Sequence, residues 1–186
     1  MTPTTPEVSL LFATDRTGAI ATNDSNSVLS TKWTSPEDLQ RFISMTRMAQ
    51  VLVCGRTTYD TFPKKPLRGR LNVVYTNDPA LLEIVPTDEL EYTNLPPAEL
   101  IQSLVVRGFK NIPICGGAEI YKLFWDAGVV NTLHVTEEPL VLSGTERIMM
   151  PFDIPSCVKA GALTLGDEWA ANEKGTMFRI YQVPKH

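Results

Sequence analysis

Short apolar runs alternate along the chain with segments in which apolar residues recur every three or four positions. Continuous apolar runs are typical of strands buried in a parallel sheet, and the longer spacing is typical of helices with one buried face. The pattern predicts strands over 8–14, 51–54, 71–76, 112–115 and 132–136, and helices over 36–48, 97–107 and 118–126.

Strands that alternate with helices predict an α/β fold, with a central, mostly parallel twisted sheet and helices on both faces. From Ala160 onward the pattern becomes that of antiparallel strands, the last over 177–183, so the sheet should end in an antiparallel C-terminal pair. No repeat or linker divides the 186 residues. We therefore expect one domain over 1–186, with a flexible tail at 1–6 and a loop from the first strand to about Ser30.

The cysteines and histidines limit the chemistry. Cys54, Cys115 and Cys157 are an odd number without CxxC spacing, which suits reduced thiols in the cytoplasm. His134 and His186 are the only histidines, so the sequence predicts no metal site. Any redox chemistry would then need a bound organic cofactor.

Charge and hydropathy limit the partners. A formal net charge of −4 argues against a general nucleic-acid binder. The sequence has no apolar run long enough to span a membrane and no signal-peptide pattern at its start. We therefore expect a cytoplasmic protein that acts on a small molecule, as a monomer or, alternatively, a dimer.

The segment from Trp33 to Phe42 places one carboxylate, Asp38, in the first turn of a helix among apolar residues. Ser35 suits the N-cap and Pro36 the first helical position, so Asp38 could complete a capping box in place of the usual Glu or Gln. Alternatively, the carboxylate faces a cleft and polarises a flat, nitrogen-rich ring. On this segment alone, the cap is the commoner arrangement.

Two strand-to-helix junctions carry glycine: Gly55 after the strand at 51–54, and Gly116-Gly117 after the strand at 112–115. Glycine lets the backbone approach a ligand closely, and a helix start offers unpaired N–H groups to phosphate. Neither junction is a GxGxxG or P-loop motif. Because open sheets bind ligands at the carboxyl ends of their parallel strands, the two junctions together predict a ligand site there.

Basic residues gather after the first junction, where Asp60 is the only acid between positions 56 and 70. The stretch is either a solvated turn or a binding site for a small polyanion. Arg56, with Thr76-Asn77 at the end of the next strand, suits a clamp for a 2′-phosphate, although Thr76-Asn77 also suits an ordinary turn. The basic residues are Arg56, Lys64, Lys65, Arg68 and Arg70.

Several motifs follow one another in the order found in dihydrofolate reductases, and the chain resembles that family over most of its length. Trp33 with Asp38 five residues on, then Leu39 and Phe42, looks like the family's substrate helix. The other matches are the first strand at 9–13, the GR-x-T-aromatic segment at 55–59, the P-L-x-G-R-x-N strand entry at 66–72, the glycine pair and helix start at 116–121, and the strand at 133–136.

The resemblance implies reduction of dihydrofolate to tetrahydrofolate by hydride transfer from NADPH. Asp38 and Trp33 would be catalytic: Asp38 would bind the pterin amino group and a ring nitrogen, and Trp33 would help to order water. Thr136 would support the same amino group, and Arg70 would pair with the glutamate carboxylate. The implied substrate walls are Leu11, Ala13, Leu39, Phe42, Phe62, Ile114 and Cys115. The implied cofactor residues are Ala13, Ile20, Ala21, Gly55, Arg56, Thr57, Thr58, Thr76, Asn77, Gly116, Gly117, Ala118, Glu119, Ile120 and Tyr121.

Some positions depart from that family. Ala21 stands where glycine is usual and Lys32 where proline is usual, and the loop at 21–32 between them is longer than is typical. Glu119 stands where some members carry arginine, which weakens the expected NADPH preference. The segments 17–21 and 137–144 look more like the related riboflavin-pathway reductases, which reduce a ribosylated pyrimidine phosphate. That reaction and a non-catalytic NADPH-binding domain are the alternatives.

Overall fold

The computed structural model describes residues 6–22, 30–144 and 146–184. Of the tail predicted over 1–6, only Pro6 falls in these ranges, and its carbonyl accepts a hydrogen bond of 2.8 Å from the Asn131 side chain. Residues 23–29 of the predicted long loop lie outside them.

Each predicted strand and helix is present within one residue of its expected bounds. The strands are β1 (Glu7–Thr14), β2 (Ala19–Thr22), β3 (Val51–Gly55), β4 (Leu71–Tyr75), β5 (Leu90–Thr93), β6 (Asn111–Ile114), β7 (Thr132–Glu137), β8 (Arg147–Met149), β9 (Thr164–Ala170) and β10 (Met177–Gln182). The helices are α1 (Pro36–Ala49), α2 (Arg56–Asp60), α3 (Pro79–Leu82), α4 (Pro97–Val106), α5 (Ala118–Asp126) and α6 (Ile154–Lys159), with a 3-10 turn at Ser30–Lys32.

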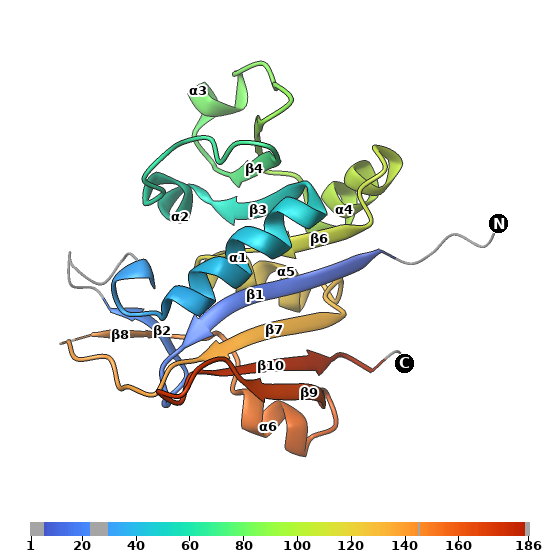
Figure 1. Ribbon diagram of the computed structural model, residues 1–186. Helices are drawn as coiled ribbons and strands as arrows, with labels where there is room; N and C mark the ends of the chain where they lie inside the picture. The colour runs from blue at the N-terminus through green and yellow to red at the C-terminus, as the bar shows by residue number, and fades with distance from the viewer. Residues whose placement is uncertain (1–5, 23–29, 145, 185–186) are drawn as a thin grey trace.

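The central sheet has the strand order β5-β4-β3-β6-β1-β7-β10-β9 (Figure 1). Neighbours from β5 through β7 are parallel, whereas β10 runs antiparallel to both β7 and β9. The predicted α/β class, with a mostly parallel sheet and an antiparallel C-terminal pair, is therefore confirmed.

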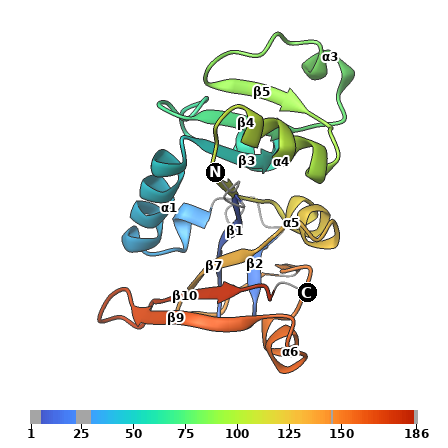
Figure 2. The ribbon, with the colours of Figure 1, turned by 90° about the vertical axis from the view of Figure 1, so that its right-hand side faces the viewer.

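Helices cover both faces of this sheet, as predicted: α1 lies on one face, and α5 and α6 lie on the other (Figure 2). Helices α4 and α5 bury Leu104 and Phe124 in the main core, against strand residues such as Val53 and Ile112. These strand residues have no exposed surface, which explains why their sequence pattern is continuous rather than alternating.

A second, two-stranded sheet was not predicted. Strand β2 pairs antiparallel with β8, with Ala21 opposite Ile148. The predicted loop after β1 therefore begins with a short strand. Strands of three or four residues carry too little periodicity to be found in a sequence, particularly when their partner lies more than 100 residues away.

Asp15 holds the turn that leads into β2. One carboxylate oxygen accepts hydrogen bonds from Thr17 N (2.7 Å), Thr17 Oγ1 (2.7 Å) and Ala19 N (3.0 Å), and the other accepts from Leu142 N at 2.8 Å. Burial by itself raises the pKa of Asp15, but these four bonds outweigh it and lower the pKa below its usual value. The buried carboxylate thus fastens the β1–β2 turn to the segment after β7.

Within the ranges that the structure describes, no helix has both the length and the apolar character needed to cross a bilayer. Nor do the described His, Cys, Asp and Glu side chains form a group of three or more that could hold a metal ion.

Candidate active site

A cleft of about 1570 Å³ opens at the carboxyl ends of the parallel strands, between α1, α2 and α5. The two glycine junctions meet in it, since Gly55 N donates to the Gly116 carbonyl at 2.7 Å and Cys115 N donates to the Val53 carbonyl at 2.7 Å. Both junctions line the cleft. Their predicted proximity is thus confirmed.

Asp38 lies in the wall of this cleft, in the first turn of α1. Half of the predicted capping box is present, because Ser35 Oγ accepts a hydrogen bond from Asp38 N at 3.3 Å. The second bond of a capping box would run from Ser35 N to the Asp38 carboxylate. Instead, Ser35 N donates to Glu138 Oε1 at 2.6 Å. The reading of Asp38 as the capping acid is wrong, because a carboxylate beyond the end of β7 occupies that place.

The surroundings of Asp38 favour a carboxyl that keeps its proton to higher pH. Burial raises the pKa of Asp38; the Thr136 and Thr34 hydroxyls lower it, the Glu138 charge raises it, and the Arg41 charge lowers it. The net direction is upward. Burial also lowers the pKa of Arg41 to about 10, so this arginine still carries its charge at neutral pH.

Several buried polar atoms near the start of α1 and in β7 have no hydrogen-bond partner of ordinary geometry in the described structure: Thr34 Oγ1, Thr136 Oγ1 and the indole Nε1 of Trp33. The two hydroxyls lie close enough to Asp38 to lower its pKa. Unpaired buried donors and acceptors are costly, so a group of them beside a carboxyl suits a polar ligand or ordered water.

The walls next to Asp38 are apolar and aromatic. Phe42 from α1 and Phe62 after α2 contact each other with tilted rings, 6.3 Å between centroids, and both line the cleft. Beneath them lies a small core cluster that includes Leu11 and Cys115. A flat ring bound against this wall would bury a face while its edge met the carboxyl.

Arg70 closes the same side of the cleft. Its side chain is buried and its Nη1 donates to the Thr46 hydroxyl on α1, while its Nε has no partner in the described structure. Burial lowers the pKa of Arg70, and the nearby Arg47 charge adds to the effect. A buried guanidinium with a free N–H on a cleft wall suits a ligand carboxylate.

The glycine pair lets the chain approach the cleft closely. Gly116 has φ +108°, which only glycine adopts readily, and a Cβ there would lie 2.9 Å from the Tyr121 hydroxyl. Neither α2 nor α5 has a side-chain cap on its first N–H groups. Two helix starts without side-chain caps on one cleft leave backbone N–H groups that suit an anionic ligand such as a phosphate.

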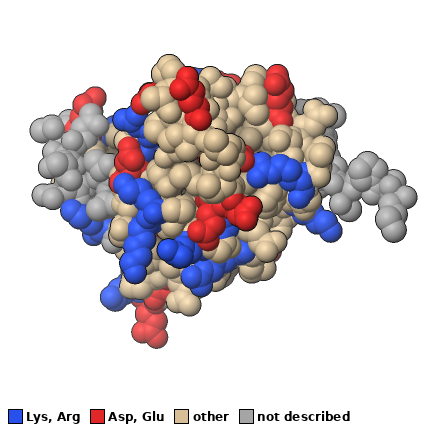
Figure 3. Space-filling model, turned by 90° about the horizontal axis from the view of Figure 1, so that it is seen from above, with Lys and Arg blue, Asp and Glu red and all other residues tan. Residues whose placement is uncertain are grey.

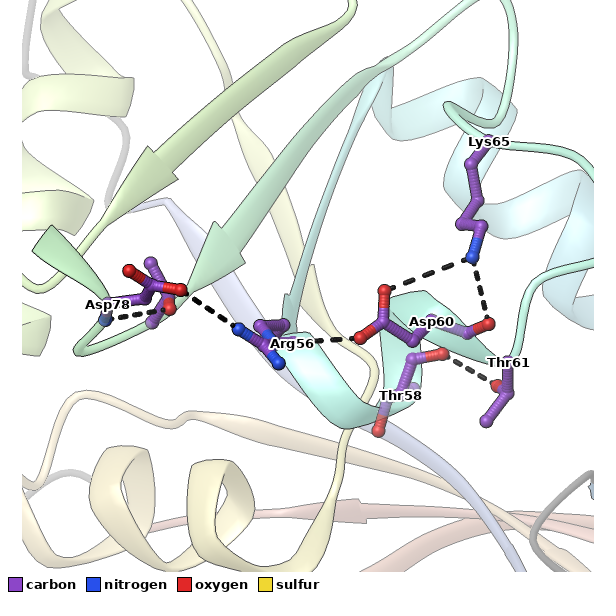
Figure 4. Close-up of polar contacts among 7 residues, drawn as sticks. Arg56, Thr58, Asp60, Thr61, Lys65 and Asp78 are labelled. Atoms are coloured by element: carbon purple, nitrogen blue, oxygen red, sulfur yellow. Dashed lines mark hydrogen bonds and ion pairs between the residues drawn. The ribbon is translucent and has the colours of Figure 1, made fainter. Parts of the chain in front are cut away.

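Arg56 sits between two carboxylates (Figure 4). Its Nη1 lies 3.2 Å from Asp78 Oδ2, and its Nε lies 3.5 Å from Asp60 Oδ2. Lys65 Nζ also lies 3.8 Å from Asp60 Oδ1. The basic stretch is therefore opposed by two acids in space rather than by Asp60 alone. Seen from the α3 end, acidic and basic side chains are interspersed on the surface and do not form one basic patch (Figure 3).

A family model described as dihydrofolate reductase matches residues 7–145. The chain belongs to the dihydrofolate reductase family. It is 29% identical over 115 residues to a dihydrofolate reductase of Aedes albopictus, and 29% identical over 114 residues to one of Lactococcus lactis subsp. lactis (strain IL1403). A putative dihydrofolate reductase of Caenorhabditis elegans is 29% identical over 141 residues.

The first two matches cover 56% and 61% of this chain, and 61% and 62% of those relatives. The match to the C. elegans protein covers 70% of each chain. The chain thus spans about three-fifths of the length of the first two dihydrofolate reductases that it matches.

Most residues singled out by the dihydrofolate reductase resemblance line the cleft. Trp33, Thr136 and Ile114 do not: the Trp33 Nε1 is buried beneath the start of α1, Thr136 has no exposed surface, and Ile114 belongs to the main core. The predicted residues that line it are Leu11, Ala13, Ile20, Ala21, Asp38, Leu39, Phe42, Gly55, Arg56, Thr57, Thr58, Phe62, Arg70, Thr76, Asn77, Cys115, Gly116, Gly117, Ala118, Glu119, Ile120 and Tyr121.

The structure adds lining residues that the sequence did not reveal. Asp78 follows the predicted pair Thr76-Asn77 directly, so its place at a strand end was the available signal. Ile148 comes from β8, whose pairing with β2 no local pattern indicated. Residues 94–97, from the end of β5 to the first residue of α4, also line the cleft.

Proposed function

We propose that this protein reduces 7,8-dihydrofolate to 5,6,7,8-tetrahydrofolate with a reduced nicotinamide dinucleotide, NADPH being the cofactor expected from the family. The observation that carries the proposal is the Asp38 carboxyl on the cleft wall, with the buried Thr34 and Thr136 hydroxyls beside it. A pterin edge offers an amino group and ring nitrogens that would satisfy such a group of atoms.

In this scheme Asp38 binds the edge of the pterin and orients its ring. Because burial raises the Asp38 pKa, the carboxyl holds a proton at its Oδ atoms to a higher pH than an exposed aspartate would. It can therefore polarise the ring and share a proton with the ring nitrogens, and a water beside Trp33 would carry a proton to the reduced nitrogen. Phe42 and Phe62, which contact each other, would form one apolar wall against the ring and help to exclude bulk water.

The residues on the other side of the cleft fit a dinucleotide. The uncapped helix starts at Gly55 and Gly117 would bind its pyrophosphate, and Ala13, Ile20 and Ala21 would surround the nicotinamide. When bound, the reduced nicotinamide supplies the hydride. The chain's own contribution is to hold the two rings in one cleft, at the distance that transfer requires.

Arg70 is assigned to the glutamate carboxylate of the substrate. Its guanidinium is held by the Thr46 hydroxyl, so it is already oriented before a ligand arrives. A ribosylated pyrimidine phosphate would instead place a sugar phosphate against the Phe42 and Phe62 rings. The apolar walls therefore favour dihydrofolate over the riboflavin-pathway substrate.

The deciding experiment follows the loss of NADPH absorbance with dihydrofolate as substrate, with the ribosylated aminopyrimidine phosphate in a parallel reaction. We expect turnover with dihydrofolate and none with the pyrimidine. Turnover of the pyrimidine alone would assign the riboflavin-pathway reaction. Binding of NADPH without turnover of either substrate would assign a non-catalytic domain.

A further inference from the structure

The adenosine end of the cleft is less basic than a 2′-phosphate site requires. Among the described residues, the charged side chains that line the cleft are Asp38, Arg56, Arg70, Asp78 and Glu119. Asp38 and Arg70 belong to the substrate side. On the cofactor side, one arginine thus shares the cleft wall with two carboxylates.

The carboxylate of Asp78 is fixed beside that arginine. Its Oδ2 accepts from Arg56 Nη1 at 3.2 Å, and its Oδ1 accepts from Ala80 N at 3.1 Å as the N-cap of α3. The backbone N–H of Asp78 donates to Thr76 Oγ1 at 3.1 Å. Since both oxygens are bonded, Asp78 cannot turn away from the cleft without losing the cap (Figure 4).

Arg56 is already paired with carboxylates. Its guanidinium contacts Asp60 as well as Asp78, whereas a phosphate clamp uses unpaired guanidinium N–H groups as a fork. Arg56 and Asp78 are each about half exposed, so their ion pair by itself is weak and a ligand could displace it. A ligand phosphate that displaced Asp78 from Arg56 would still lie next to the Asp78 charge.

We propose that Asp78 is a specificity-determining residue that disfavours a 2′-phosphate, so that this protein binds NADH about as tightly as NADPH. A carboxylate at the ribose accepts hydrogen bonds from a free 2′-hydroxyl, which is the arrangement of NAD-binding sites. The same carboxylate repels a phosphate that carries close to two negative charges. The inference rests on the proposed function only in requiring that a nicotinamide dinucleotide occupies the cleft.

The test is calorimetric titration of the full chain with NADPH and, separately, with NADH. In the unaltered protein we expect the two dissociation constants to lie within about tenfold of each other. Asp78→Asn removes the charge and keeps an N-cap oxygen for Ala80 N, so folding should be preserved. We expect Asp78→Asn to tighten NADPH about tenfold while NADH binding stays equal or weakens.

Asp60→Asn is the matched control, because it removes the other carboxylate on Arg56 from a position that does not line the cleft. Its effect on the NADPH-to-NADH ratio should be clearly smaller than that of Asp78→Asn. An unchanged ratio in Asp78→Asn, or a preference for NADPH above about a hundredfold in the unaltered protein, would overturn the inference alone. Failure of both dinucleotides to bind would contradict the proposed function, and the inference with it.

Discussion

The backbone N–H of Ser35 donates to Oε1 of Glu138 at 2.6 Å, across 103 positions of sequence. The other oxygen of this buried carboxylate accepts from Thr176 Oγ1 at 2.7 Å, and Asn172 links Thr176 to Glu37 in the first turn of α1. The turn between β9 and β10 is thereby tied to the helix that carries Asp38. Because Glu138 completes the cap, the Asp38 carboxyl is available to the cleft.

Glu138→Ala should lower the free energy of unfolding by about 1–3 kcal/mol, because it leaves the Ser35 N–H and the Thr176 hydroxyl without their acceptor. Urea denaturation measures this loss. Glu138→Gln, which keeps one acceptor oxygen, should cost less than half as much. Equal stability of the alanine variant and the unaltered protein would contradict the assigned cap.

Asp38→Asn should lower dihydrofolate turnover by about 10²–10⁴-fold while the fold stays intact. The folded pKa of Asp38 is raised, so its ionisation costs stability as pH rises from the usual 3.8 through the folded value. The asparagine variant should therefore be at least as stable at neutral pH, and its advantage should shrink as the pH falls toward 3.8.

The matched variant for Asp38→Asn is Ser35→Ala, which removes the oxygen that caps Asp38 N. It should lose about 1 kcal/mol of stability and keep most of its turnover per folded molecule. The reverse pattern, with Asp38→Asn unstable and Ser35→Ala inactive, would restore the capping role of Asp38.

Arg70→Ala should raise the KM for dihydrofolate about 10–100-fold and leave the dissociation constant of the dinucleotide nearly unchanged. The reason is that Arg70 lies on the substrate side, fixed by Thr46. Thr46→Val removes only that support and should have a smaller effect in the same direction. Equal weakening of substrate and dinucleotide would show that Arg70 has a general structural role.

Asp15→Asn should destabilise the protein by about 2–4 kcal/mol at neutral pH, because an amide cannot accept all four hydrogen bonds. The folded pKa of Asp15 is lowered, so its stabilising contribution is present above the usual 3.8 and is lost as pH falls through the folded value. Denaturation over a pH series should show the difference from the unaltered protein shrinking below 3.8. A pH-independent difference would contradict this linkage.

The central strands and the longer helices could be predicted because each leaves a strong local pattern. Val51 to Cys54 are fully buried, so every position must be apolar and the run is visible in the sequence. Ser35 and Pro36 mark the start of α1 for local reasons too, since they act on the nearest backbone N–H groups. The glycines at 55, 116 and 117 likewise mark the strand ends that meet in the cleft.

Only the tertiary structure decided which charges meet. Glu138, directly after β7, meets Ser35 at the start of α1, 103 positions earlier in the sequence. Asp78 reaches Arg56 because β4 lies beside β3. Electrostatic and hydrogen-bond partners depend on distances of a few ångströms, which sequence spacing does not fix. The sequence alone therefore determined the fold class and the place of the cleft. The tertiary structure decided which carboxylates are held in hydrogen bonds and which line the cleft.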